Sequence, residues 1–181
     1  MTHSAFIKDL DNRRALARKH MMNGAVTEDF TQDKDKIIDL LNEALATELI
    51  CVLRYKAHYY TAHGRGAKVA SAEFWEHAQE EQEHADQLAE RIAQLGGVPE
   101  MNPDELSKRA HSDYHSGGDT LEMLQEDLVA ERIAISSYRE MINYVGEKDP
   151  TTRRILEELL AKEEEHADDL VDLIEHIDGE R

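Results

Sequence analysis

Two stretches of the chain carry the same pair of metal-binding side chains at the same spacing. The stretches EQEHADQLAERIAQLGG and EEEHADDLVDLIEHIDG begin at Glu81 and Glu163, and eight of their seventeen positions are identical. Each opens with Glu-x-x-His, which adds His84 to the first and His166 to the second. Residues three apart lie on one face of a helix, and carboxylate with imidazole suits a transition metal. The repeat predicts two matching halves of a metal centre.

A further glutamate precedes each copy. Glu48 stands 33 residues before the first copy and Glu131 stands 32 residues before the second. Each is followed seven residues later by a tyrosine, Tyr55 or Tyr138. Each half therefore offers one Glu and one Glu-x-x-His, which is the ligand set of a two-metal carboxylate site in a four-helix bundle.

The surrounding hydrophobic pattern places these residues inside the protein. Apolar residues recur at steps of three and four in all four segments, and a Glu or His interrupts each line near its middle, on the buried side. Crowded, buried carboxylates repel one another and lose hydration, unless cations bind among them. The alternative is a polar core network that satisfies itself, and it would have to arise at matching depth on four helices.

The elements that position these residues are all expected to be helices. The chain has only three Pro and nine Gly, and most of them mark element ends. We expect an all-α, antiparallel four-helix bundle with a long crossover between its second and third main helices. The first main helix is expected to start at a cap at Thr31 or Asp33 and to end near His63, and the second is expected to end at Gly96-Gly97. The short extra helix is expected to run from Asn102 to near His111. The third main helix is expected to run from Asp119 to Gly146, and the fourth to start at Asp149-Pro150. The expected divisions are an N-terminal extension (1–32), the bundle (33–178) and a tail (179–181).

The charge is strongly acidic, except near the N-terminus. Thirty-nine acidic and 21 basic residues give a net charge of −18, which argues against a general nucleic-acid surface. Either a solvated, salt-adapted face or patches that attract metal cations would explain it. A basic segment, expected to form a short helix from Ser4, could contact phosphates or dock on a neighbouring subunit. Its basic residues are Lys8, Arg13, Arg14, Arg18 and Lys19.

Three other features bear on compartment and chemistry. Cys51 is the only cysteine, so an intrachain disulfide is impossible and a reducing compartment is expected. It acts either as a small buried hydrophobe or in redox or metal chemistry. The sequence shows no leader peptide and no apolar run of 18 residues, so a soluble, cytoplasmic protein without membrane contact is expected. His77, one turn before Glu81, is either a packed core residue or a side chain that supports the site.

Four motifs resemble those of the ferritin-like superfamily, and of bacterioferritins in particular. They are ATEL around Glu48, EQEHAD from Glu81, DLVAER around Glu131, and EEEHAD from Glu163. The likeness spans about residues 33 to 178. It implies a ferroxidase centre that oxidises Fe(II) with O2 or H2O2, and a hollow homo-oligomeric shell that stores the mineral.

The resemblance also assigns roles to individual residues. It implies that Glu48 and His84 hold one iron ion, and that Glu131 and His166 hold the other. Glu81 and Glu163 would bridge the two ions, and Tyr55 would lie beside the site and could supply an electron. Manganese or zinc could occupy the same ligands.

The sequence departs from the bacterioferritin pattern in several places. Bacterioferritins bind haem through a Met directly after the helix-two Glu, where this chain has Gln82, so no haem is expected. The sequence stops fifteen residues after His166, too soon for the fifth helix of 24-subunit ferritins. The N-terminal extension and the short helix after Asn102 resemble Dps-like miniferritins, which implies twelve subunits. That subfamily often carries a cysteine pair, which this chain cannot form.

Two other functions are compatible with the same helices. A rubrerythrin-like peroxide reductase would use the same ligands, but rubrerythrins usually add a Cys-rich electron-transfer domain. A DNA-protecting structural shell would bind metals incidentally, and the acidic composition argues against DNA as a partner.

Overall fold

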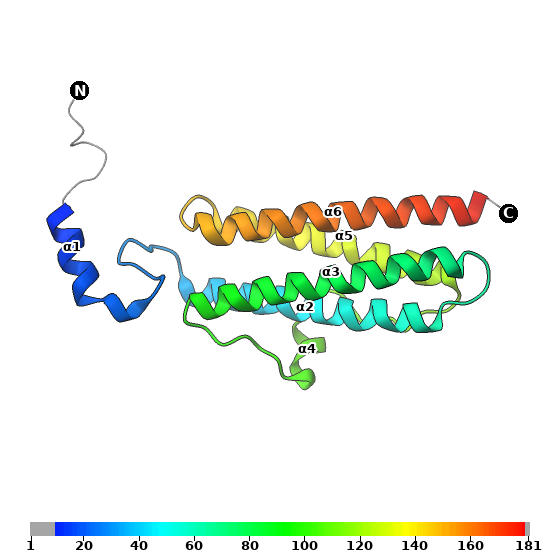
Figure 1. Ribbon diagram of the computed structural model, residues 1–181, viewed down its shortest axis with the longest axis horizontal. Coiled ribbons are helices and arrows are strands. Elements are labelled where there is room, and N and C mark those ends of the chain that lie inside the picture. The colour runs from blue at the N-terminus through cyan, green and yellow to red at the C-terminus, as the bar shows by residue number, and fades with distance from the viewer. Residues whose placement is uncertain (1–9, 180–181) are drawn as a thin grey trace, which may run out of the picture.

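A computed structural model describes residues 10–179 of the chain. Four long helices form the body of the molecule, and α4 (Pro103–Arg109) lies beside α2, outside the bundle (Figure 1). The long helices are α2 (Lys34–Thr61), α3 (Ala67–Gln94), α5 (Thr120–Val145) and α6 (Pro150–Gly179). The expected all-α four-helix bundle with a long crossover and an extra short helix is confirmed.

The helices pair as two antiparallel hairpins. Short loops join α2 to α3 and α5 to α6, whereas the crossover between residues 95 and 119 carries the chain back along the bundle (Figure 1). Leu106 of α4 packs against Ala46 and Ile50 of α2, which fixes the crossover to the bundle.

The helix ends follow the capping residues predicted from the sequence. The side chains of Asp33, Asn102 and Asp119 accept hydrogen bonds from backbone N–H groups in the first turns of α2, α4 and α5. Asp149 does the same for α6 through the Thr152 N–H. Two ends differ slightly from the prediction: α2 ends at Thr61 rather than near His63, and α4 ends at Arg109 rather than near His111.

Glycine is required where the chain turns tightly between helices. Gly96, directly after α3, has a φ of +79°. Gly66 has a φ of +72°, and a Cβ there would lie 2.4 Å from Ile177 Cδ1. The close approach of Ile177 packs the end of α6 against the start of α3.

The N-terminal region stands apart from the bundle. Helix α1 (Leu10–Lys19) and the single turn η2 (Met21–Asn23) project beyond one end of it, and α1 has no buried residue (Figure 1). The predicted helix start at Ser4 and the basic residue Lys8 lie outside the described residues. The chain reaches the core through Val26 and Phe30.

Two of the three apolar clusters of the core lie along the bundle axis, and the third holds α4 against α2. One contains Leu41, Leu88 and Leu156, and the other contains Phe74, Leu124 and Leu170. The six predicted metal ligands are buried, and on each long helix they lie between residues of the two clusters, as Glu48 does between Leu45 and Cys51. The polar residues therefore form a separate layer inside the bundle.

Candidate metal centre

The structure brings the six predicted ligands together inside the bundle. Each long helix contributes, and each of the six residues is at most 3% exposed. The contributions are Glu48 from α2, Glu81 and His84 from α3, Glu131 from α5, and Glu163 and His166 from α6.

The ligands form two overlapping groups. Glu48 and His84 form one with Glu81 and Glu163, while Glu131 and His166 form the other with the same two glutamates. Within each group, one ligand atom per residue lies within 4.8 Å of all the others. Two cations side by side would therefore share Glu81 and Glu163, one from each copy of the repeat.

Both imidazoles direct the same nitrogen toward these carboxylates. His84 Nδ1 lies 3.0 Å from Glu163 Oε1 and 3.3 Å from Glu81 Oε2. His166 Nδ1 lies 3.4 Å from Glu81 Oε1. The two nitrogens therefore face the shared glutamates from the two halves.

The hydrogen-bonding capacity of this layer is not satisfied by the protein. Nine buried side-chain nitrogen and oxygen atoms of the described residues lack a hydrogen-bond partner, and seven of them belong to the six candidate ligands. Such orphaned atoms are rare and costly in folded proteins. This argues against a self-satisfied polar network, and bound cations would supply the missing partners. The residues present therefore fit a two-metal site.

Neighbouring side chains hold the ligands in place. The Tyr55 hydroxyl donates a hydrogen bond to Glu131 Oε1, and the Tyr138 hydroxyl donates one to Glu48 Oε1. His166 Nε2 lies 2.7 Å from Glu80 Oε2. Contacts of this kind fix the orientation of a metal ligand, and the Glu80 carboxylate also raises the basicity of the His166 imidazole.

Burial and mutual repulsion shape the protonation of the carboxyl groups. Burial, and then the charge of Glu81, raise the pKa of Glu48, Glu131 and Glu163. Burial alone would also raise the pKa of Glu81, but the Glu48 carboxyl and the two imidazoles around it hold that pKa low. Without metal, Glu48, Glu131 and Glu163 therefore bind protons more tightly than exposed glutamates do.

Burial acts on the imidazoles in the opposite direction, but the neighbouring carboxylates overcome it. Burial by itself would lower the pKa of His84, but Glu48 and Glu81 raise it to about 10. Glu81 and Glu131 likewise raise the pKa of His166 to about 9, against the effect of burial. Metal ions must displace these protons, so metal binding is coupled to proton release.

His77 is both packed in the core and in contact with the candidate site. Its Nδ1 lies 3.2 Å from the Tyr55 hydroxyl. Its ring stacks on that of His166, with centroids 4.0 Å apart and an interplanar angle of 21°. Burial, and then the charge of His166, lower the pKa of His77 to about 3. The packed-core interpretation and the site-supporting interpretation of His77 therefore each describe part of its environment.

Sequence reasoning missed two sets of residues near the centre. Glu80 gave no signal, because one more acidic residue in so acidic a chain is unremarkable. His58, to which the sequence assigned no role, is fully buried and its Nδ1 lies 2.8 Å from Asp127 Oδ2. The same carboxylate accepts a 2.8 Å hydrogen bond from Arg54 Nε. The two residues of the His58–Asp127 pair are 69 positions apart in the sequence, and those of the Arg54–Asp127 pair are 73 apart. Helical spacing could therefore not reveal these pairs.

Cys51 packs as part of the apolar core. Its side chain is 3% exposed in the same cluster as Tyr55 and Phe74, and burial raises the pKa of the thiol. It belongs to none of the groups of potential metal ligands within residues 10–179. Packing therefore favours the small-hydrophobe interpretation.

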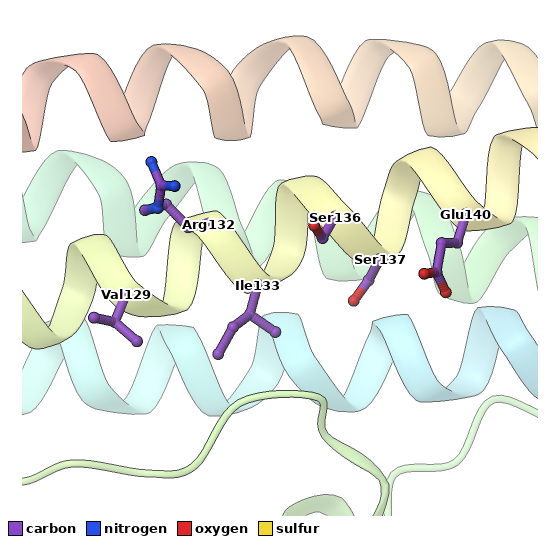
Figure 2. A pocket seen from close by; sticks show the side chains of 6 residues that line it. All are labelled: Val129, Arg132, Ile133, Ser136, Ser137 and Glu140. Carbon is purple, nitrogen blue, oxygen red and sulfur yellow. The ribbon is translucent and has the colours of Figure 1, made fainter.

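A shallow surface pocket on α5 is separate from the metal centre. Val129, Ile133 and Ser136 help to line it, and Figure 2 shows that all of its labelled side chains come from this one helix. None of its lining residues is one of the six candidate ligands.

Comparison with known proteins identifies the family. A family model described as a ferritin-like domain matches residues 38–179. The chain belongs to this ferritin-like family. The bacterioferritin of Brucella melitensis is 34% identical over 152 residues, covering 81% of this chain and 89% of the relative. A nutrient stress-induced DNA-binding protein of Synechococcus is 31% identical, covering 81% of this chain and 92% of the relative.

Solved ferritin-like structures share the fold. The dodecameric thioferritin of Bacteroides fragilis, a bacterioferritin-related protein, superimposes with a TM-score of 0.78 and 36% sequence identity. The alignment covers 81% of this chain and 88% of the thioferritin. Among residues 10–179, no helix is long and apolar enough to cross a membrane.

Proposed function

We propose that this ferritin-like chain is a ferroxidase and iron-storage protein, which oxidises Fe(II) at a two-iron site inside each subunit. The observation that carries this proposal is the pair of overlapping ligand groups that share Glu81 and Glu163, with seven buried ligand atoms left without partners. The names of the bacterioferritin and thioferritin relatives agree with it.

Each ligand has a role in binding the substrate ions. Glu48 and His84 hold one Fe(II), Glu131 and His166 hold the other, and Glu81 and Glu163 bridge them. Bridging carboxylates keep two metals roughly 3.5 to 4 Å apart, which lets both act on one oxidant. Two Fe(II) ions each give one electron, and one H2O2 with two protons becomes two water molecules. With O2 as the oxidant, the same two electrons and two protons give one H2O2.

The surrounding residues prepare the site for this reaction. Tyr55 and Tyr138 orient Glu131 and Glu48 through their hydroxyl groups. We expect Tyr55 to be able to supply an electron, since its hydroxyl donates a hydrogen bond to the proposed ligand Glu131. Gln82 stands where a haem-binding Met would be required, so no haem is expected. The expected metal is iron held directly by side chains of the bundle. Manganese and zinc, with similar ligand preferences, are expected to compete for the site.

The oxidised iron is stored inside a shell of identical subunits, and we propose twelve per shell in a cytoplasmic protein. The dodecameric state of the Bacteroides fragilis relative supports this number over 24. DNA is a less suitable partner, although one relative is a DNA-binding protein. In the described part of the basic segment, Arg14 lies 3.0 Å from Asp11 and Arg13 lies 3.8 Å from Asp29, so acidic neighbours offset their charge.

Replacing both shared glutamates tests the ferroxidase assignment. The double variant Glu81→Ala, Glu163→Ala should lose rapid Fe(II) oxidation, followed by the absorbance of Fe(III), because neither ion keeps a bridging ligand. Its assembly should persist, since both side chains lie inside one bundle. Glu90→Gln, an exposed change on α3, is the control. Unchanged oxidation kinetics in the double variant would refute the proposed function.

A further inference from the structure

A second cluster of metal-binding side chains lies between α3 and α6, one helical turn from the six candidate ligands. Glu73 and His77 stand four residues apart on α3, and Asp169 faces them from α6. His77 Nε2 lies 3.1 Å from Glu73 Oε1 and 4.0 Å from Asp169 Oδ2. None of the three belongs to the ligand set proposed for the iron pair.

The nitrogen at the centre of this cluster has no hydrogen-bond partner. His77 is 1% exposed, and its Nε2 is one of the orphaned buried atoms, because its approach to Glu73 lacks hydrogen-bond geometry. The Tyr55 hydroxyl donates to Glu131, so the Tyr55 oxygen is free to accept a hydrogen bond from His77 Nδ1–H. This tautomer leaves a lone pair on Nε2 that faces two carboxylates. A cation is the partner that such an arrangement lacks.

Unlike the iron pair, this cluster is open to solvent. The side chains of Asp169 and Glu73 are 48% and 25% exposed, whereas the six candidate ligands are all buried. One imidazole and two carboxylates suit divalent first-row metals such as Fe(II), Co(II) and Zn(II). Three protein ligands with a solvent-facing side leave room for exchangeable water.

The cluster is linked to the buried centre by a series of ligand groups. His77 also forms a group of potential ligands with Glu131 and His166, again with atoms within 4.8 Å of one another. Glu131 and His166 in turn belong to one half of the iron pair. Each group shares at least one residue with the next. A cation that moves from solvent to the interior would therefore meet potential ligands at each step.

We propose that Glu73, His77 and Asp169 form a third divalent-cation site, at which Fe(II) from solution binds before it moves to the buried pair. Cation binding at this site follows from its own ligands. The delivery role rests on the proposed ferroxidase function.

Anaerobic Co(II) binding tests the site independently of oxidation. Equilibrium dialysis of the full-length protein should give three Co(II) per subunit, and the variant Glu73→Gln, Asp169→Asn should bind two. Asp86→Asn, an exposed change of the same charge on α3, should still bind three. Binding of only two Co(II) by the parent protein, or of three by the double variant, would overturn the third site.

Combining variants separates failure of the third site from failure of the iron pair. With Glu81→Ala and Glu163→Ala, one Co(II) per subunit should remain, and adding Glu73→Gln with Asp169→Asn should remove it. If the remaining equivalent survives these last two changes, the third site is wrong. If the parent protein binds a single Co(II) that disappears with Asp169→Asn, the third site stands and the two-iron proposal fails.

Kinetics test the delivery role. At limiting Fe(II), oxidation in the variant Glu73→Gln, Asp169→Asn should slow about tenfold, the lower end of what a charged capture site contributes. At saturating Fe(II) the rate should match the parent protein, because the buried ligands are intact. Asp86→Asn should leave both rates unchanged, which removes loss of general negative charge as the explanation. Equal rates at limiting Fe(II) in the two proteins would overturn delivery through this site.

Discussion

Tyr55 and Tyr138 occupy equivalent places in the two halves of the repeat, but their surroundings differ. Each hydroxyl donates to a glutamate that belongs to the other half, Glu131 or Glu48. Only Tyr55 also contacts an imidazole, that of His77. The two tyrosines therefore provide a matched pair for separating a positioning role from a redox role.

The two Tyr→Phe variants should differ in oxidation but not in stability. Each leaves a buried carboxylate oxygen without its donor, so both should lower the free energy of unfolding by about 1–3 kcal/mol. If Tyr55 supplies an electron, Tyr55→Phe should slow Fe(II) oxidation more than Tyr138→Phe does. Thermal unfolding and stopped-flow absorbance measure the two effects. Equal rates in the two variants would assign Tyr55 to positioning alone.

Protonation of the ligands should make the metal-free protein less stable at alkaline pH. The pKa values of His84 and His166 are raised to about 10 and about 9, against about 6.5 in an unfolded chain. A raised folded-state pKa gives stability that is fully present below the unfolded value and is lost as the pH rises through the folded value. The raised pKa of Glu48 and Glu163 acts in the same direction.

The unfolding temperature of the metal-free protein should therefore fall between pH 6 and pH 10. The Co(II)-loaded protein should not show this fall, because its imidazoles are already deprotonated by the metal. A flat or rising profile for the metal-free protein would contradict the protonation pattern of the ligand layer.

Residue spacing identified the six candidate ligands, which the structure brings together, because their signal is helical and local. Glu81 and His84 lie one turn apart within an apolar line, and so do Glu163 and His166. The cluster around His77 is different, since Asp169 comes from another helix and is half-exposed. In a chain with 39 acidic residues, spacing cannot distinguish such a carboxylate from a solvated one.

At the scale of the helices, a buried ion pair attaches the crossover to the bundle. Arg54 of α2 is 1% exposed and pairs with Asp127 of α5. Arg54 Nη1 also donates to the Asp113 carbonyl at 3.4 Å, and His58 Nε2 lies 3.1 Å from the His115 carbonyl. One network therefore joins two helices of the bundle to the segment that connects the hairpins.

Breaking this network should destabilise the fold more than a surface change does. Asp127→Ala leaves the Arg54 charge buried and unpaired, which typically costs about 3–5 kcal/mol. Asp113→Ala is the control, because it keeps the backbone carbonyl that accepts from Arg54. Chemical denaturation measures both variants. A loss for Asp127→Ala no larger than that of the control would contradict a structural role for the pair.

Helix boundaries could be predicted almost to the residue, whereas the network could not. Helix starts could be predicted from Asp33, Asn102 and Asp119, because capping depends on residues within one turn. The crossover path also followed from topology, since a loop of that length must return along the bundle. The Arg54–Asp127 pair depends on how α2 and α5 face each other, which local sequence does not specify.

At the scale of the whole molecule, the bundle alone does not enclose a volume for mineral. Helix α1 has no buried residue and extends beyond one end of the bundle (Figure 1). The exposed side chains of Met21 and Met22, at 74% and 87%, lie just after it. We expect this region to contact a neighbouring subunit, as a closed shell of identical chains requires.

Assembly into twelve subunits should be visible by light scattering. The expected mass is that of a dodecamer at low and at high salt, because a closed shell is held by many repeated contacts. A stable dimer would instead favour soluble peroxide reduction without storage. A 24-subunit mass would contradict the likeness in assembly to the Bacteroides fragilis relative.

Direct location of iron tests the central claim most closely. Crystals of the protein soaked anaerobically with Fe(II) should show two anomalous peaks per subunit, measured at the iron absorption edge, inside the bundle. Glu81 and Glu163 should lie between the two peaks, with His84 beside one and His166 beside the other. A single peak, or iron confined to the outer surface, would contradict a two-iron centre in each subunit.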